Sequence, residues 1–179
     1  MDIFAHALWA GAGAKGLNKR AGKRRVNVWA MALWGVFPDL FAFSIPFIWI
    51  MGSIVFGGHH FADFGGRPPI AEPTNPDALA LSNLSHVLYN VSHSLIIFSA
   101  VFIAVWVYFK QVRLELIGWL MHILMDVPTH TYAFFPTPVF WPIFDWKFNG
   151  ISWGVTWFMV LNYSCLLLAY ALLARKRKV

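Results

Sequence analysis

The sequence predicts an all-α fold: a polytopic membrane helix bundle of about four to five membrane-embedded helices with a short N-terminal helix. Of the 179 residues, 59% are hydrophobic and only 12% are charged, whereas about 25% of residues are charged in a typical soluble domain. The mean hydropathy is +0.59. A soluble domain of this size could not cover so much apolar surface with so few charges. We therefore expect one integral membrane domain over residues 1–179.

The first long apolar run, 26–56, exceeds what a hydrocarbon core of about 30 Å requires. Pro38 and Pro46 interrupt it, and proline removes a backbone donor and clashes with the preceding turn. We expect a bent or two-part span in which a break at Pro38 lets Asp39 point inward. The Gly- and Pro-rich segment 57–77 that follows is predicted to be a loop.

The remaining helices follow in order. Asp77 is expected to cap a helix that continues unbroken over 77–109. A shorter helix is predicted over 114–127, ended by Pro128. The aromatic, proline-rich segment 128–150 is predicted to be an interfacial loop, and 151–174 is long enough for a final transmembrane helix.

Basic residues lie in three clusters that border apolar segments: 15–25, 110–113 and 175–178. The positive-inside rule places all three, with the C-terminus, in the cytoplasm. The loops 57–77 and 128–150 then face outward. The net charge of +6 is thereby explained by membrane topology, and nucleic acid is not an expected partner. The N-terminal segment carries its positive charge after its apolar stretch, unlike a signal peptide, and is expected to belong to the mature fold.

Ionisable residues recur in the apolar stretch "GWLMHILMDVPTH" at His122, Asp126 and His130. Residues four apart share one face of a helix, and His–Asp pairs of this spacing can simply hydrogen-bond. However, Asp39, His93 and His6 fall at similar depths, about 13 to 24 Å from the basic ends of their helices. An isolated Asp at such depth costs about 2.5–3.5 kcal/mol, and a divalent cation would compensate two.

We therefore predict a site for one or two divalent metal ions, with zinc favoured because imidazole and carboxylate ligands suit it. The single cysteine, Cys165, excludes a Cys-based zinc site. The predicted metal ligands are His6, Asp39, His93, His122 and Asp126. Asp39, Asp126 and His93 are the candidate catalytic residues.

Four further residues are possible members of the site: His86, Asn90, Ser94 and His130. Ser94 follows His93 and could orient its imidazole. His86 lies two turns from His93 and fits a substrate or entrance role better than a ligand role. His130 continues the His122–Asp126 face, but beyond Pro128 its alignment is open.

Four motifs carry a family resemblance: "FAHALWAG", "GVFPDL", "SHSL" and "HILMD", in that order. Together they resemble the bacterial inner-membrane metal-dependent hydrolases, also described as LexA-binding, inner-membrane-associated hydrolases. The resemblance extends from about His6 to about Gly150. It implies metal-binding roles for the five predicted ligands and a location in the bacterial inner membrane.

The expected function is a membrane-embedded metal-dependent hydrolase, because a coordinated metal lowers the pKa of bound water toward 7. The substrate is expected to be a phosphoester or lipid-like molecule at the outer half of the bilayer, reached from the periplasmic face or sideways from the membrane. The alternative is a proton or metal-ion transporter or channel, which also places His and Asp inside a membrane. The chain is short and shows no internal repeats, which argues against a transporter. A scaffold role ranks last, and the sequence leaves the oligomeric state open.

Overall fold

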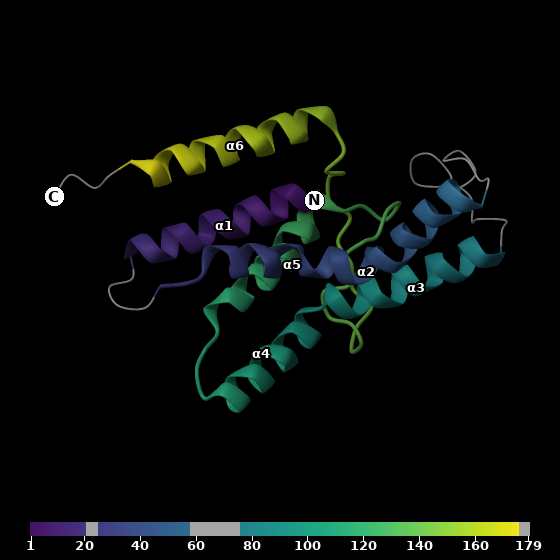
Figure 1. Ribbon diagram of the computed structural model, residues 1–179, viewed down its shortest axis with the longest axis horizontal. Helices are drawn as coiled ribbons and strands as arrows, with labels where there is room; N and C mark the ends of the chain where they lie inside the picture. The colour runs from purple at the N-terminus through teal and green to yellow at the C-terminus, as the bar shows by residue number, and fades with distance from the viewer. Residues whose placement is uncertain (21–24, 58–75, 176–179) are drawn as a thin grey trace.

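The computed structural model describes residues 1–20, 25–57 and 76–175. Over these residues the chain forms six α-helices, a single 3-10 turn and no named strand, which confirms the all-α prediction (Figure 1). The elements are α1 (Ile3–Arg20), α2 (Val28–Phe56), α3 (Pro76–Ser92), α4 (Leu95–Phe109), η2 (Leu114–Leu116), α5 (Ile117–Thr129) and α6 (Thr156–Ala174).

Two of these helices, α2 and α6, are long and apolar enough to cross a membrane. The pair α3–α4 makes a third span if it is counted as one broken helix. At 13 residues α5 is too short to cross alone, and α1 has 18 residues with a basic last turn. The structure thus supports a membrane helix bundle with two or three candidate spans, fewer than the four to five predicted.

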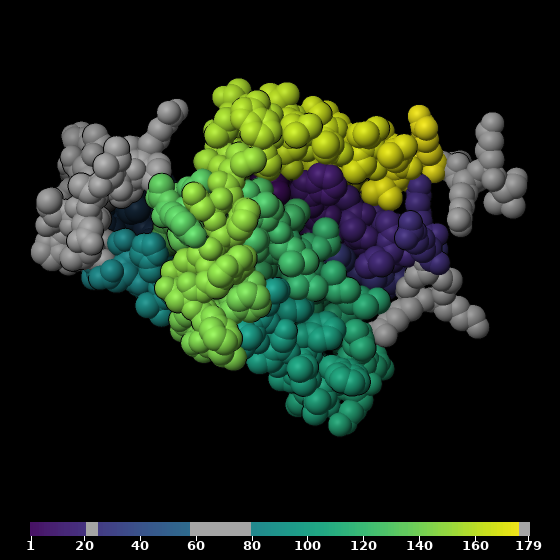
Figure 2. Space-filling model, turned by 180° about the vertical axis from the view of Figure 1, so that it is seen from behind, coloured from purple at the N-terminus to yellow at the C-terminus, as the bar shows by residue number. Residues whose placement is uncertain are grey.

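The centre of the fold is α2, which packs against α1, α3 and α5 (Figure 1). The last helix, α6, lies on the outside against α1. Hydrogen bonds join them: for example, Trp9 Nε1 donates to Asn162 Oδ1 at 2.9 Å, and the Tyr170 hydroxyl donates to the Leu8 carbonyl at 3.0 Å. Figure 2 shows the segment between α5 and α6 lying across the face opposite to that seen in Figure 1.

Helices α1, α2 and α5 approach one another closely at two glycines. A Cβ added at Gly118 of α5 would lie 2.1 Å from the carbonyl oxygen of Met31 in α2. A Cβ added at Gly35 would lie 2.6 Å from the Cβ of Ala10 in α1. Only glycine fits either position, and the sequence analysis did not single out either residue. This packing brings the helices that carry His6, Asp39 and His122 to one place.

Helix α2 runs continuously from Val28 to Phe56 with Pro38 and Pro46 inside it, and Figure 1 shows it changing direction along its length. The predicted interruption at Pro38 was therefore wrong, because the helix tolerates the lost donor without ending. The inward orientation of Asp39 is confirmed, since its carboxylate lies 3.6 Å from two histidines.

The helix predicted to run unbroken to Phe109 is instead broken at residues 93–94, where α3 and α4 meet at a bend of 57°. The reason is local: the Ser94 hydroxyl accepts hydrogen bonds from the backbone N–H groups of Ile96 and Ile97 and so caps a new helix. Loop residues complete the break, because the Leu95 N–H donates to the Val139 carbonyl at 2.9 Å.

Three helix ends also differ from the sequence prediction. Helix α3 begins at Pro76, so Asp77 lies inside it. Helix α5 continues through Pro128 to Thr129, because a proline in the last turn loses only one backbone donor. Helix α6 begins at Thr156 instead of 151, while residues 130–155 form turns and irregular backbone, as predicted for most of that segment.

The C-terminal ends of α1 and α6 lie together (Figure 1). Lys19 Nζ donates to the carbonyl oxygens of Leu172 at 3.2 Å and Arg175 at 2.9 Å. This arrangement agrees with one shared side for these two clusters. The cytoplasmic assignment of that side stays a prediction, and most of the predicted loop 57–77 lies outside the described residues.

Candidate metal centre

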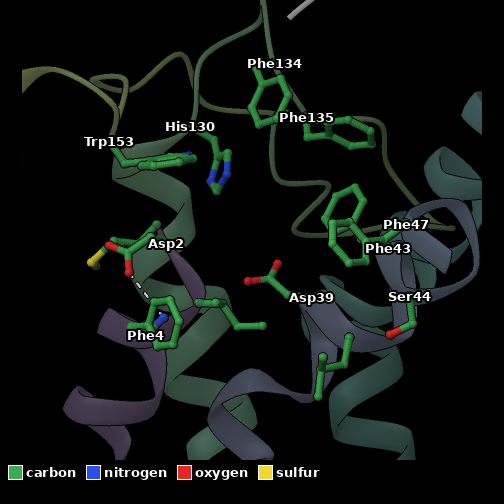
Figure 3. Close-up of a pocket in the computed structure, with 13 residues that line it drawn as sticks. Asp2, Phe4, Asp39, Phe43, Ser44, Phe47, His130, Phe134, Phe135 and Trp153 are labelled. Atoms are coloured by element: carbon green, nitrogen blue, oxygen red, sulfur yellow. Dashed lines mark hydrogen bonds between the residues drawn. The ribbon is translucent and has the colours of Figure 1, made fainter. Parts of the chain in front are cut away.

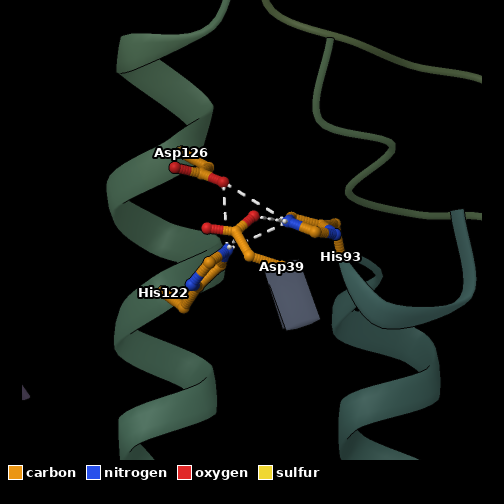
Figure 4. Close-up of side chains that lie close together, drawn as sticks. All are labelled: Asp39, His93, His122 and Asp126. Carbon is orange, nitrogen blue, oxygen red and sulfur yellow. Dashed lines mark hydrogen bonds and ion pairs between the residues drawn. The ribbon is translucent and has the colours of Figure 1, made fainter. Parts of the chain in front are cut away.

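Four of the five predicted ligands converge on one point: Asp39 from α2, His93 from the break between α3 and α4, and His122 and Asp126 from α5 (Figure 4). One ligand atom from each lies within 4.8 Å of all the others. The Nε2 atoms of His93 and His122 are 2.9 Å apart. Asp126 Oδ2 lies 3.1 Å from His122 Nε2 and 3.4 Å from His93 Nε2.

The tautomers of the two histidines follow from their other ring nitrogens. His122 Nδ1 lies 2.7 Å from the carbonyl oxygen of Gly35, and His93 Nδ1 lies 3.1 Å from that of Tyr89. A carbonyl only accepts, so Nδ1 carries the proton in each ring and Nε2 carries the lone pair. In the neutral rings, two lone pairs therefore face each other across 2.9 Å. A cation between them removes this repulsion.

The distances also suit a small divalent ion. Zinc with ligands at about 2.0–2.1 Å in a tetrahedron requires ligand atoms about 3.3 Å apart. The two histidine Nε2 atoms lie 2.9 Å apart, and their distances to the carboxylate oxygens of Asp39 and Asp126 run from 3.1 to 3.6 Å. Among the described residues, Asp126 Oδ2 is buried without a hydrogen-bond partner. Buried polar atoms are rarely left so. The donor set therefore fits a metal ion.

The fifth predicted ligand, His6, lies against the other oxygen of Asp126. Its Nε2 is 3.0 Å from Asp126 Oδ1, but neither ring nitrogen has a hydrogen bond among the described residues. The His6 ring stacks on that of His122 with centroids 3.7 Å apart. The α-amino group of Met1 and His130 Nδ1 lie 2.5 and 3.5 Å from the same oxygen. Asp126 thus faces the two histidines of the four-residue cluster with Oδ2 and faces His6 with Oδ1.

The break after α3 presents His93 to the cluster. Ser92, which the sequence analysis passed over, lies within hydrogen-bond distance of His93 Nδ1 at 2.9 Å and of the Pro38 carbonyl oxygen at 3.2 Å. Tyr89 stacks on the His93 imidazole with centroids 3.7 Å apart. Trp119 Nε1 donates to the Ser92 carbonyl at 2.6 Å. Ser92 and Tyr89 therefore hold the imidazole in place, and Trp119 holds the backbone of Ser92. In the sequence, the serine on each side of His93 indicated that a hydroxyl could orient this ring.

The four additional candidates take separate positions. The role predicted for Ser94 belongs to Ser92, because Ser94 caps α4 and donates to the Trp141 carbonyl at 2.5 Å. His86 stacks on Phe135, away from the four-residue cluster, and Asn90 is partly buried on α3. His130 is buried beside Asp126, and burial lowers its pKa from 6.5 to about 4, so that the ring is neutral at neutral pH.

Replacing Ser92 with alanine is expected to lower metal affinity by about 10- to 100-fold, the usual effect of losing a group that orients a metal-binding histidine. Titration of the purified protein with zinc against a chromophoric chelator measures this affinity. Ser94→Ala is the matched control: it removes a helix cap worth about 1 kcal/mol and leaves zinc affinity within a few-fold. Equal losses of affinity in the two variants would remove Ser92 from the centre.

A cavity of about 570 Å³ adjoins the centre (Figure 3). Asp39 and His130 line it, and Figure 3 shows their side chains pointing into it from opposite sides. The Asp39 side chain is 16% exposed, whereas those of His93, His122 and Asp126 are fully buried. Asp39 is therefore the member of the cluster that a molecule in the cavity meets first.

Compared with models of known protein families, with curated proteins and with solved structures, the chain matches none.

Proposed function

We propose that the protein is a membrane-embedded metal-dependent hydrolase that acts on a phosphoester or lipid-like substrate through metal-activated water. The observation that carries this proposal is the four-residue cluster itself: two histidine lone pairs and two carboxylates converge within 4.8 Å in the interior of a membrane helix bundle. Ionisable groups inside a membrane are costly unless they are compensated, and such groups usually mark a functional site.

The residues divide the work as follows. His93, at the break between α3 and α4, and His122, on α5, would hold a divalent ion, zinc in our proposal, and Asp39 and Asp126 would neutralise it. Asp126 reaches His6 with its second oxygen, which supports a second ion on that side. A bound ion supplies a Lewis acid that polarises a phosphoryl or carbonyl oxygen and makes water acidic enough to react at neutral pH. Asp39, the only partly exposed member of the cluster, would accept the proton that the attacking water loses.

The membrane assignment of the proposal has three supports. The motifs around His6, Asp39, His93 and His122 resemble a family of bacterial inner-membrane hydrolases. The C-terminal ends of α1 and α6 lie together, and the positive-inside rule places them and the C-terminus in the cytoplasm. The centre lies beside the irregular segment 130–155, at the opposite end, so the substrate would be met in the outer half of the bilayer.

The test combines turnover and transport. Purified protein is assayed with bis(p-nitrophenyl) phosphate and with phospholipid vesicles, before and after chelation and after zinc is restored. We expect hydrolysis that chelation abolishes and zinc restores, and that Asp39→Asn lowers by at least about 100-fold, since removing a general base costs about 10²–10⁴. Metal-dependent ion flux across liposomes without ester turnover would instead establish the transporter alternative.

A further inference from the structure

The cavity beside the centre is unlike a pocket for a water-soluble molecule. Its walls are mainly aromatic and aliphatic, with Phe43, Phe134, Phe135 and Trp153 among them. The carboxylate of Asp2, which also lines it, accepts hydrogen bonds at Oδ1 from the Tyr163 hydroxyl at 2.8 Å and from two backbone N–H groups, while its Oδ2 has no partner among the described residues. Beside Asp2, the ionisable side chains that line it are Asp39 and His130, and Ser44 is a further polar one (Figure 3).

The rim of the cavity is also apolar, and it is exposed. Phe4, Leu40 and Phe47 line the cavity, yet their exposed fractions are 72%, 46% and 59%. Leu40 and Phe47 lie in α2, one of the helices able to cross a membrane. Large exposed apolar side chains around a cavity mark a surface that meets an apolar partner. On a membrane-spanning helix that partner is the hydrocarbon of the bilayer.

The lining residues of α2 form a track that leads away from the centre. Asp39, Phe43 and Phe47 are spaced four residues apart and so lie along one side of the helix. From Asp39 to Phe47 this track is about 12 Å long. Figure 3 shows Phe43 and Phe47 grouped together to one side of Asp39. The cavity therefore has a polar end at the centre and an elongated apolar end within the span.

We propose that this cavity binds the hydrocarbon chain of a phosphate-ester lipid, which enters sideways from the bilayer and places its phosphate at Asp39 and the metal centre. The inference rests on the proposed function for the role of the head group. A volume of about 570 Å³ is in the usual range of ligand sites, about 300–1,000 Å³. It is many times the roughly 30 Å³ that one water molecule occupies in the liquid, so a phosphate group alone would leave most of it unfilled.

The solvation of the two ends favours this occupant over a water-soluble ester. A hydrocarbon chain that moves from the bilayer into an apolar cavity exchanges one apolar environment for another. A hydrated substrate would have to give up hydrogen bonds to water that these walls cannot replace. The cavity thus selects a substrate that has an apolar chain next to its phosphate.

The probe is hexadecyl phosphate with a photoreactive diazirine in the middle of its chain, added to metal-loaded protein in nanodiscs of dioleoyl phosphatidylcholine. After irradiation, the labelled residues are located by mass spectrometry. We expect labelling of Phe43 or its neighbours in the cavity wall that an excess of plain hexadecyl phosphate suppresses at least fivefold. Labelling of outward-facing residues such as Leu167 should not respond to this competition, because free lipid contacts them without saturation.

A matched pair of variants assigns the labelling to the cavity. Ser44→Trp places an indole in the cavity, whereas Ile45→Trp places one on an exposed neighbouring residue of α2 that does not line it. We expect the competed labelling to fall at least fivefold in the first variant and to stay within twofold in the second. Bound zinc should be unchanged in both, which shows that the centre is intact, and Leu40→Trp serves as a second filling variant if Ser44→Trp lacks zinc.

The outcomes separate this inference from the proposed hydrolase. Labelling in the cavity that competition does not reduce, or that both filling variants leave unchanged, overturns the chain-binding inference even if chelator-sensitive hydrolysis is observed. Competed labelling that the filling variants remove, without turnover of any ester, supports chain binding and overturns the hydrolase. Loss of competed labelling on chelation supports the placement of the phosphate at the metal, and labelling that is insensitive to chelation overturns that placement.

Discussion

Replacing Asp126 with alanine lowers the metal content of the purified protein to less than about one tenth of the wild-type value, and His122→Ala does the same. Asp126 faces both sides of the centre, with Oδ2 3.1 Å from His122 and Oδ1 3.0 Å from His6. Its loss removes negative charge from both sides and leaves Asp39 as the one carboxylate of the four-residue cluster to neutralise a divalent cation. Elemental analysis after dialysis against metal-free buffer measures the change.

Asp145→Ala is the matched control for this experiment. Its carboxylate is exposed and pairs with Lys147 at 2.8 Å, in the segment between α5 and α6, and the variant is expected to retain its metal. Unchanged metal content in Asp126→Ala and His122→Ala together would show that no ion binds where the structure brings the four residues together.

Replacing Gly118 with alanine destabilises the fold and weakens metal binding together. The added Cβ would lie 2.1 Å from the carbonyl oxygen of Met31, so α5 must move away from α2. Overpacking of this kind costs about 1–3 kcal/mol, and it separates His122 and Asp126 from Asp39. The expected result is a lower midpoint of thermal unfolding in detergent, with zinc affinity reduced at least about tenfold.

Gly52→Ala tests whether any such loss comes from contact and not from helix chemistry. A Cβ at Gly52 meets no atom within 4 Å, and alanine is favoured over glycine in a helix by about 1 kcal/mol. Gly52→Ala should therefore be neutral or stabilising and should bind metal normally. If Gly118→Ala behaved the same way, the close approach of α2 and α5 would have no part in forming the centre.

Local patterns in the sequence were enough to predict the members of the cluster. The spacing of His122 and Asp126 places them on one helix face, and the cost of a buried Asp required a partner at similar depth. Asp39 and His93 met that requirement, and the structure brings all four together. The depth of a residue in the membrane does not show which oxygen of Asp126 it contacts. The sequence therefore did not reveal that His6 lies on the Oδ1 side, apart from the other four residues.

What the sequence could not supply were contacts between distant segments. The break before α4 depends on Val139 and Trp141, which accept hydrogen bonds from Leu95 and Ser94. An apolar run gives no sign of partners more than forty residues away. The close approach at Gly35 and Gly118 was equally hidden, because periodicity shows which face of a helix is apolar but not which helix packs against it. Proline also did not mark the helix ends that the sequence predicted, since α2 and α5 both continue through it.

The segment between α5 and α6 is tied to the broken span by its backbone. Val139 and Trp141 accept hydrogen bonds from residues at the start of α4, and Gly150 donates to the His130 carbonyl at 2.8 Å. Inside a membrane each of these polar groups needs a partner. Lifting this segment would expose several of them at once and release His93 from its position. It therefore forms a fixed cover beside the four-residue cluster, and the lipid that we propose as ligand would enter and leave past the exposed side chains of α2.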